Sequence, residues 1–239
     1  MGSNDVREVT VFDRPAYGSA EAARILGLPP ATVKAWCFGQ TYRAAGGAEK
    51  HFKPVIKPAD RRNRLLSFAN LCELHVLSAI RRHHRVTLPK VRRSLEYVRE
   101  KLSSPRPLLD TQFQTNGIDL FVAHASQLLN VSKQGQQALR GEFERALSRI
   151  ERDLDGTPVR LFPFTRSRSD LADQPTAIVI DPRLAFGRPA LVKAGVTTDV
   201  IEDRFRAGDS PDEMAADYGV DQSDIWEAIR FELEQRRAA

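Results

Sequence analysis

The sequence has few of the residues and patterns on which several classes of protein depend. It contains two cysteines in 239 residues, Cys37 and Cys72, and both lie in apolar patterns typical of helices. No further cysteine or histidine lies at zinc-site spacing, so we expect two packed thiols, neither a disulfide nor a metal pair. No apolar run approaches the roughly 18 residues of a membrane span, and the polar N-terminal residues contain no signal-peptide core. These absences predict a cytoplasmic protein.

Patterns that carry catalysis are also absent. The chain has no glycine-rich phosphate loop, no nucleophile elbow and no metal-ligand spacing. Its paired carboxylates lie in helix turns that we expect to be exposed. We therefore expect no enzymatic activity, no cofactor and no bound metal.

Charge is divided unequally along the chain. The net charge is +5, but residues 171–239 contain 8 basic and 14 acidic residues, which leaves 28 basic and 17 acidic residues before them. A basic first part fits a polyanion such as DNA, because phosphate neutralisation dominates that binding. An acidic last part fits a protein partner or a solvated helical surface.

A helix–turn–helix pattern occupies about residues 19–38. Ser19 is placed as the N-cap of a short helix, and Gly27 ends that helix. Pro30 stands at the first position of a second helix, where its missing N–H costs nothing. The second helix is the candidate major-groove reader. The alternative is an ordinary helical corner without any DNA-binding role.

The segment after the helix pair is rich in positive charge. We expect an irregular linker over residues 39–51 and a β-wing over residues 52–68, followed by a helix that Ser67 caps. Five cations fall within twelve positions of the wing segment: Lys53, Lys57, Arg61, Arg62 and Arg64. A basic hairpin after a helix–turn–helix is where a winged reader contacts the sugar-phosphate backbone, although charge runs are also common on solvated faces.

Residues 17–102 resemble the winged helix–turn–helix of MerR-type regulators. The likeness rests on the opening Ser-Ala-Glu-Ala-Ala-Arg-Ile-Leu-Gly-Leu, the reader Thr-Val-Lys-Ala-Trp, the basic wing, and Leu-Leu-Ser-Phe-Ala-Asn-Leu before a helix pair. The resemblance implies that these side chains face DNA: Thr32, Lys34, Arg61, Arg62 and Arg64. We also expect contacts from Lys57 of the charge run and from Arg43 of the linker, although a solvated loop is the alternative for Arg43. The chain lacks the single long dimerisation helix and the effector site of those regulators, so metal or drug sensing is not implied.

The middle of the chain has a different pattern. Asn116 followed by Gly117 between apolar residues signals a two-residue hairpin turn. We expect strands over residues 120–122, 127–131 and 159–164, and a helix over residues 137–154. Such a unit would build a dimer interface or bridge the two ends of the chain.

The C-terminal block follows a polar linker at 165–175. Two short strands around a glycine-containing turn are expected after Ile178, with helices over residues 198–207, 211–218 and about 222–235. Ser210 caps the second of these helices. The expected apolar face of the last helix consists of Ile225, Trp226, Ile229 and Leu233. The acidic balance of this block argues against DNA binding.

This block resembles a small domain of unknown function found in bacterial antitoxin-like proteins that are encoded beside PIN-domain toxins. The likeness rests on Asp-Pro, Gly-Arg-Pro, Gly-Asp-Ser-Pro-Asp-Glu-Met-Ala and Ile-Trp-Glu-Ala-Ile. With a helix–turn–helix in front, the architecture resembles the VapB-type antitoxins of type II toxin–antitoxin pairs. The resemblance implies a VapC-like PIN-domain ribonuclease toxin as partner, operator DNA bound as a homodimer, and repression of the protein's own operon.

Three arginines of the last helix are the candidates for contact with such a toxin: Arg230, Arg236 and Arg237. An arginine can form a bidentate pair with the carboxylates of a metal-dependent nuclease. The alternative is that these arginines balance neighbouring glutamates on a solvated helix.

Together these patterns predict a mainly α fold with small β elements, an α+β class. We expect a DNA-binding domain over residues 1–102, a connecting or dimerisation unit over residues 103–168, and an antitoxin-type helical domain over residues 169–239. The main alternative to the antitoxin hypothesis is a stand-alone MerR-like transcriptional regulator with an effector-binding C-terminal domain.

Overall fold

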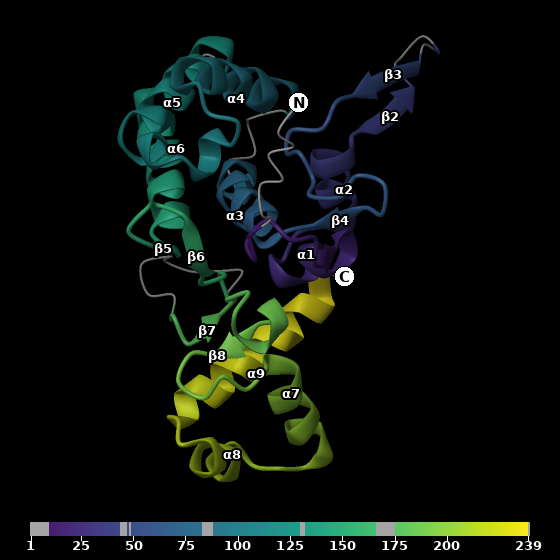
Figure 1. The fold of residues 1–239 in the computed structure, drawn as a ribbon, viewed down its shortest axis with the longest axis vertical. Helices are drawn as coiled ribbons and strands as arrows, with labels where there is room; N and C mark the ends of the chain where they lie inside the picture. Colours follow the sequence, from purple (N-terminus) through teal and green to yellow (C-terminus); the bar gives the residue numbers. More distant parts are fainter. Residues whose placement is uncertain are drawn as a thin grey trace, which may run out of the picture.

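The computed structural model describes residues 10–43, 47, 49–82, 88–129, 132–165 and 175–238. This part of the chain is mainly helical with short antiparallel strand pairs, which confirms the expected α+β class (Figure 1). The helices are α1 Ser19–Ile25, α2 Pro30–Phe38, α3 Phe68–Arg82, α4 Leu88–Leu102, α5 Ile118–Leu129, α6 Lys133–Leu147, α7 Thr198–Ala207, α8 Pro211–Tyr218 and α9 Gln222–Ala238. The strands are β1 Tyr17–Gly18, β2 Gln40–Arg43, β3 Glu49–Phe52, β4 Leu65–Leu66, β5 Ile150–Arg152, β6 Pro158–Leu161, β7 Ile178–Val179 and β8 Ala190–Leu191. Most of the expected 165–175 linker lies outside the described residues.

The helix–turn–helix forms where the sequence predicts it. The N-cap of α1 is Gly18, one residue before the expected Ser19, and the Gly18 N–H donates to the Glu21 carboxylate at 3.3 Å. Gly27 ends the turn after α1 with a φ of 59°, a value that glycine adopts without strain. Pro30 opens α2 as expected.

The β-wing lies earlier in the chain than the sequence analysis places it. β2 and β3 form an antiparallel hairpin in the segment expected to be a linker, with Gln40 opposite Phe52 and Arg43 opposite Glu49. Between residues 53 and 67, all of which the structure describes, β4 pairs instead with β1. The hairpin escapes detection because its described side chains are almost all polar and exposed, so it lacks the apolar alternation that identifies strands.

One large apolar core joins the N-terminal and middle parts of the chain. It extends from Phe12 to Ile180, and helix α3 lies at its centre, between the helix–turn–helix and helices α4 to α6 (Figure 1). Ser67 caps α3 as expected, since its hydroxyl accepts the Asn70 N–H at 3.2 Å. Cys37 and Cys72 are free and buried in this core, which confirms the expectation of packed thiols. Burial raises the pKa of both thiols.

The hairpin predicted at Asn116 and Gly117 is wrong. Residues 113–117 form a π-helical turn that continues into α5. Residues 120–122 and 127–129, where strands are expected, are therefore helical, and residues 130 and 131 lie outside the described part of the chain. Phe113, Ile118 and Phe121 are all buried, and this helical spacing outweighs the local turn signal of the Asn-Gly pair. The antiparallel hairpin of the middle part is β5–β6, and α6 begins at Lys133 and ends at Leu147, before the expected end at 154.

Residues 178–238, from β7 to α9, are called here the C-terminal unit. They contain their own apolar cluster, which includes Ile201, Met214 and Ile225. The strands and helices of this unit match the sequence prediction, and Ser210 and Glu213 form the capping box of α8. α9 passes from this unit to α1 of the helix–turn–helix (Figure 1). In the described part of the chain, no helix is long and apolar enough to cross a membrane.

Candidate nucleic-acid interface

Helix α2 presents a small, open face to solvent. Val33 and Cys37 are completely buried against the rest of the core, whereas Lys34 is exposed and Thr32 is half-buried. Ala31 is also exposed, so the side chains around Lys34 are short enough for close approach to a base edge. This arrangement fits a recognition helix whose buried face fixes its orientation and whose outer face meets the major groove.

The β2–β3 hairpin projects from the molecule directly beyond α2 (Figure 1). Gly39 joins the two elements with a φ of 83°, and a Cβ at this position would lie 2.5 Å from the Phe52 carbonyl oxygen. Arg92 of α4 fixes the other end of the hairpin, since its guanidinium lies 4.9 Å from the Phe52 ring and donates to the Lys53 carbonyl at 3.3 Å. The base of the hairpin is therefore fixed to α2 and α4, and Arg43 lies exposed at the far end of β2.

Residues 60–65 form a basic turn beside the end of α2. The backbone groups of Asp60 and Leu65 exchange two hydrogen bonds, of 3.0 and 2.9 Å, that close this turn. Hydrogen bonds from Asn63 to the Asp60 carboxylate hold the pKa of that carboxyl below its ordinary value, so Asp60 stays ionised and keeps the turn closed. Arg61 and Arg62 point to solvent from this turn, whereas the Arg64 guanidinium lies 5.1 Å from the ring of Phe38, the last residue of α2.

Sequence reasoning overlooks Asn70, a completely buried side chain of α3 that positions the basic segment. Its amide oxygen accepts the Ala59 N–H at 2.9 Å, and its amide nitrogen donates to the Lys57 carbonyl at 2.9 Å. Ser67 and Asn70 lie three positions apart, which is the spacing of a reciprocal helix cap. This spacing is the feature of the sequence from which the role of Asn70 could be predicted. Asn70 thus links the start of α3 to the segment that contains Lys57 and the basic turn.

The expected DNA-binding residues lie on α2, on the hairpin, on the irregular segment 53–59 and on the basic turn that follows it. None of their six cations forms an ion pair with any residue that the structure describes: Lys34, Arg43, Lys57, Arg61, Arg62 and Arg64. All six are exposed. Unpaired cations on neighbouring elements produce a positive surface that can attract an anion such as a DNA phosphate.

The arginines expected to contact a toxin have intramolecular partners. Arg230 donates to Glu227 at 3.0 Å, and Arg236 donates to Glu202 at 2.6 Å. The Arg237 side chain lies outside the described part of the structure. Both glutamates are buried. The Arg236–Glu202 pair joins α9 to α7, whereas the Arg230–Glu227 pair lies within α9.

Among the residues that the structure describes, no group of three or more His, Cys, Asp or Glu side chains is arranged to hold a metal ion. The buried His75 has a structural environment: its ring stacks on Phe164 at 4.9 Å, and its Nε2 lies 3.1 Å from the Ala146 carbonyl oxygen.

Two family models match this chain. Residues 15–95 match the family described as "Putative DNA-binding HTH domain", an interval that runs from β1 into α4 and contains the expected DNA-binding residues. Residues 178–231 match the family described as "Protein of unknown function (DUF433)", which covers most of the C-terminal unit.

Two curated proteins of Mycobacterium tuberculosis (strain ATCC 25618 / H37Rv) are similar along nearly the whole chain. "Putative antitoxin VapB45" is 27% identical over 236 residues, which cover 91% of this chain and 94% of that protein. "Uncharacterized protein Rv2308" is 26% identical over 246 residues, which cover 98% of this chain and 97% of that protein. The crystal structure of Rv2018 from Mycobacterium tuberculosis has a TM-score of 0.65 at 22% identity, and the match covers 92% of this chain and 99% of that one. At that identity the structural likeness shows the fold alone.

Proposed function

We propose that this chain is a DNA-binding antitoxin that neutralises a VapC-like PIN-domain ribonuclease and represses its own operon. The observation that carries the proposal is the set of unpaired cations on α2 and on the hairpin and basic segment that follow it, within a chain that aligns over 91% of its length with a relative named as an antitoxin. Because that alignment extends over both the helix–turn–helix and the C-terminal unit, the likeness is not limited to a common DNA-binding module.

In the proposed DNA complex, a homodimer places two α2 helices in successive major grooves. Thr32 and Lys34 then face base edges, while Arg43 of the hairpin and Arg61 and Arg62 of the basic turn contact the phosphates. These different roles follow from the positions of the residues. The hairpin and the basic turn flank α2, just as the sugar-phosphate backbone of DNA flanks the major groove. Binding of this kind weakens steeply with salt.

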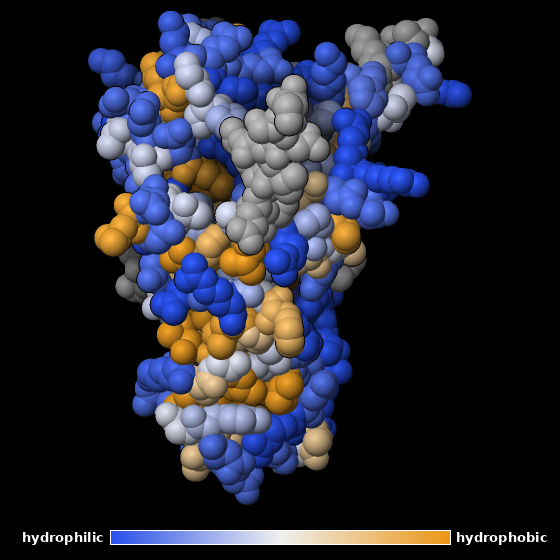
Figure 2. Space-filling view, viewed as in Figure 1, coloured by the Kyte–Doolittle hydropathy of each residue, from blue (hydrophilic) through white to orange (hydrophobic). Residues whose placement is uncertain are grey.

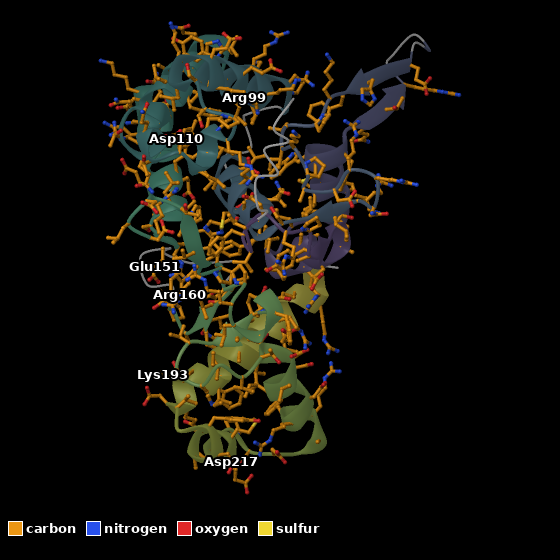
Figure 3. The ribbon with its side chains drawn as sticks, in the orientation of Figure 1. Arg99, Asp110, Glu151, Arg160, Lys193 and Asp217 are labelled. Atoms are coloured by element: carbon orange, nitrogen blue, oxygen red, sulfur yellow. The ribbon has the colours of Figure 1, made fainter. Side chains whose placement is uncertain are left out.

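In the proposed toxin complex, the C-terminal unit holds the ribonuclease. This unit lies at the opposite end of the molecule from the β2–β3 hairpin, and Figure 3 places Lys193 and Asp217 of the unit far from the hairpin. The two partners therefore have separate surfaces on one chain, as an antitoxin that also represses its operon requires.

The test is a pull-down of the tagged, full-length chain from its native host, followed by identification of any stoichiometric partner. Recovery of a small PIN-domain protein whose ribonuclease activity this chain suppresses would support the antitoxin half of the proposal. Recovery of the chain alone or with DNA only would contradict that half and favour the stand-alone regulator.

The DNA half has an independent test. The purified chain is titrated against its own upstream region and against an unrelated duplex of the same length and base composition. We expect at least about a thousandfold preference for the upstream region at physiological salt. Equal affinity for the two duplexes would contradict autoregulation.

A further inference from the structure

Exposed apolar side chains are concentrated in the C-terminal unit. Seven large hydrophobic residues of the described chain are exposed, and all except Leu154 belong to this unit: Phe186, Val192, Val200, Phe205, Trp226 and Leu233. Figure 2 shows bands of apolar surface over the lower half of the molecule, where Figure 1 places β7, β8 and α9. Such a concentration on one unit is typical of an interaction surface.

An aromatic pair marks the position of this surface on α7 and α9. The rings of Phe205 and Trp226 meet edge to face, with their centroids 5.7 Å apart, and both side chains remain exposed to solvent. Leu233 follows Trp226 by seven residues on the same side of α9 and is 46% exposed. The apolar pattern predicts Trp226 and Leu233 on the buried face of α9, and this prediction is wrong because both side chains are exposed. The buried face instead contains Ala228 and Phe231 beside Ile225 and Ile229, so Phe205, Trp226 and Leu233 form a separate docking face.

The charge around the docking face is strongly negative. Residues 199–230 contain ten acidic and three basic side chains, and of the ten acids only Glu202 and Glu227 are buried. The three basic residues are paired within the unit: Arg204 with Asp209 and Asp217, Arg206 with Glu202, and Arg230 with Glu227. Arg188 and Lys193, just before this segment, pair with three more of its acids. The exposed carboxylates of the segment that form no ion pair with a described residue are those of Asp203, Asp212 and Glu213. The exposed carboxylates therefore dominate the field that an approaching partner meets.

We propose that the docking face binds a cationic protein surface with an apolar pocket that receives Trp226. This inference rests on the proposed function and names the part of the toxin that is covered: the basic surface on which a ribonuclease binds its RNA substrate. A second copy of this chain does not fit, because two acidic faces repel each other, and DNA does not fit for the same reason. In this mechanism the acidic docking face blocks the RNA-binding surface of the toxin. The mechanism expected from the sequence is different, because there an arginine of α9 pairs with the toxin's catalytic carboxylates.

The apolar part of the proposal is tested with the purified full-length chain and the purified PIN-domain partner from the pull-down. Trp226→Ala removes an exposed side chain, so the fold is retained, which circular dichroism checks. We expect its affinity for the partner to fall at least about 30-fold, as for a central aromatic anchor of an interface. Leu154→Ala, at the exposed apolar residue outside the C-terminal unit, is the matched control and leaves the affinity unchanged.

The charge part is tested by the double substitution Asp203→Lys and Asp212→Lys. Both aspartates are exposed and form no ion pair with any described residue. We expect a slower association rate with a weaker dependence on salt, because the change removes the electrostatic attraction. Glu100→Lys on the remote helix α4 is the control, and it leaves the rate unchanged.

The outcomes distinguish this inference from the proposed function. If the wild-type chain binds the partner and the Trp226 and double-lysine variants bind it equally well, the docking face is wrong while the antitoxin function stands. Faster association of the double-lysine variant would show an acidic partner surface and would overturn the inference. Absence of binding by the wild-type chain would overturn both proposals.

Discussion

Lys34 and the pair Arg61 and Arg62 contribute differently to the proposed DNA complex. Lys34 lies on the outer face of α2, whereas both arginines lie on the basic turn beside it. We expect Lys34→Ala to weaken binding to the operator by about 1–3 kcal/mol with little effect on unrelated DNA. We expect Arg61→Ala and Arg62→Ala to weaken binding to all sequences and to reduce the salt slope by about one each. Titrations of operator and unrelated duplexes at several salt concentrations measure both effects.

The control for these variants is Lys193→Ala. Lys193 belongs to the C-terminal unit and is paired with Asp221 and Asp224 there, so its removal leaves DNA binding unchanged. Unaltered affinity in the Lys34, Arg61 and Arg62 variants alike would contradict the assignment of α2 and the basic turn to the DNA interface.

Glu73 makes stability depend on pH. Burial raises its pKa from 4.5 to about 7, although the nearby Arg106 and a 2.9 Å hydrogen bond from Asn70 act in the opposite direction. The folded state therefore binds the proton more tightly than the unfolded state, so the stabilisation from Glu73 is complete below pH 4.5 and is lost as the pH rises to about 7. The loss amounts to about 3 kcal/mol at most.

The variant that checks this effect is Glu73→Gln, which cannot ionise. We expect its stability, measured by urea unfolding at pH 5, 6 and 7, to be nearly independent of pH relative to the wild type. Glu100→Gln, at an exposed glutamate of α4, retains the wild-type dependence and serves as control. If the free energy of unfolding changed with pH in the same way in the wild type and in the Glu73 variant, the prediction would be contradicted.

At the scale of elements, the sequence predicts helices with one apolar face and misses features that depend on tertiary contacts. The helix–turn–helix and α7 to α9 follow from periodicity and caps, as Pro30 and Ser210 illustrate. The β2–β3 hairpin was missed because its strands are polar on both faces. The hairpin predicted at Asn116 and Gly117 is wrong because the burial of Phe113 and Phe121 on a common helical face outweighs the local turn propensity. In the candidate site, the exposure of the cations can be predicted from their residue type. The position of the hairpin and the role of Asn70 depend on tertiary contacts and cannot be predicted from the sequence.

Gly39 controls the angle between α2 and the hairpin. A Cβ there would lie 2.5 Å from the Phe52 carbonyl oxygen, and the φ of 83° disfavours any side chain. We expect Gly39→Ala to lower the free energy of unfolding by about 1–3 kcal/mol and to weaken DNA binding, because the hairpin must shift. Gly141→Ala, inside α6 with no atom within 4 Å of its new Cβ, should instead stabilise the protein by about 0.5–1 kcal/mol. Urea unfolding of both variants measures the two changes in the free energy of unfolding. If both changes had the same sign, the prediction would be contradicted.

At the scale of the whole molecule, polar contacts join the helix–turn–helix to the C-terminal unit. Arg24 of α1 donates at 3.0 Å to both Glu232 and Gln235 of α9, and the Tyr17 hydroxyl donates to the Gly187 carbonyl at 2.9 Å. Polar interfaces between parts of one chain permit relative motion more readily than large apolar ones. The helix–turn–helix and the C-terminal unit are therefore coupled through a contact that a single substitution can weaken.

Arg24→Ala is that substitution. Glu232 is buried and would keep only its hydrogen bond from Thr198, so we expect the contact between α1 and α9 to weaken by about 1–3 kcal/mol. Amide hydrogen exchange should accelerate in α1 and in the last turns of α9, while α7 and α8 keep their protection because their apolar cluster does not involve Arg24.

Operator affinity should change little, since Arg24 lies on α1 and not on the outer face of α2. Arg140→Ala, which breaks an exposed pair with Asp119, is the control. If exchange in α9 is unchanged while DNA affinity falls, α1 itself contacts DNA and the polar contact does not hold the two parts together.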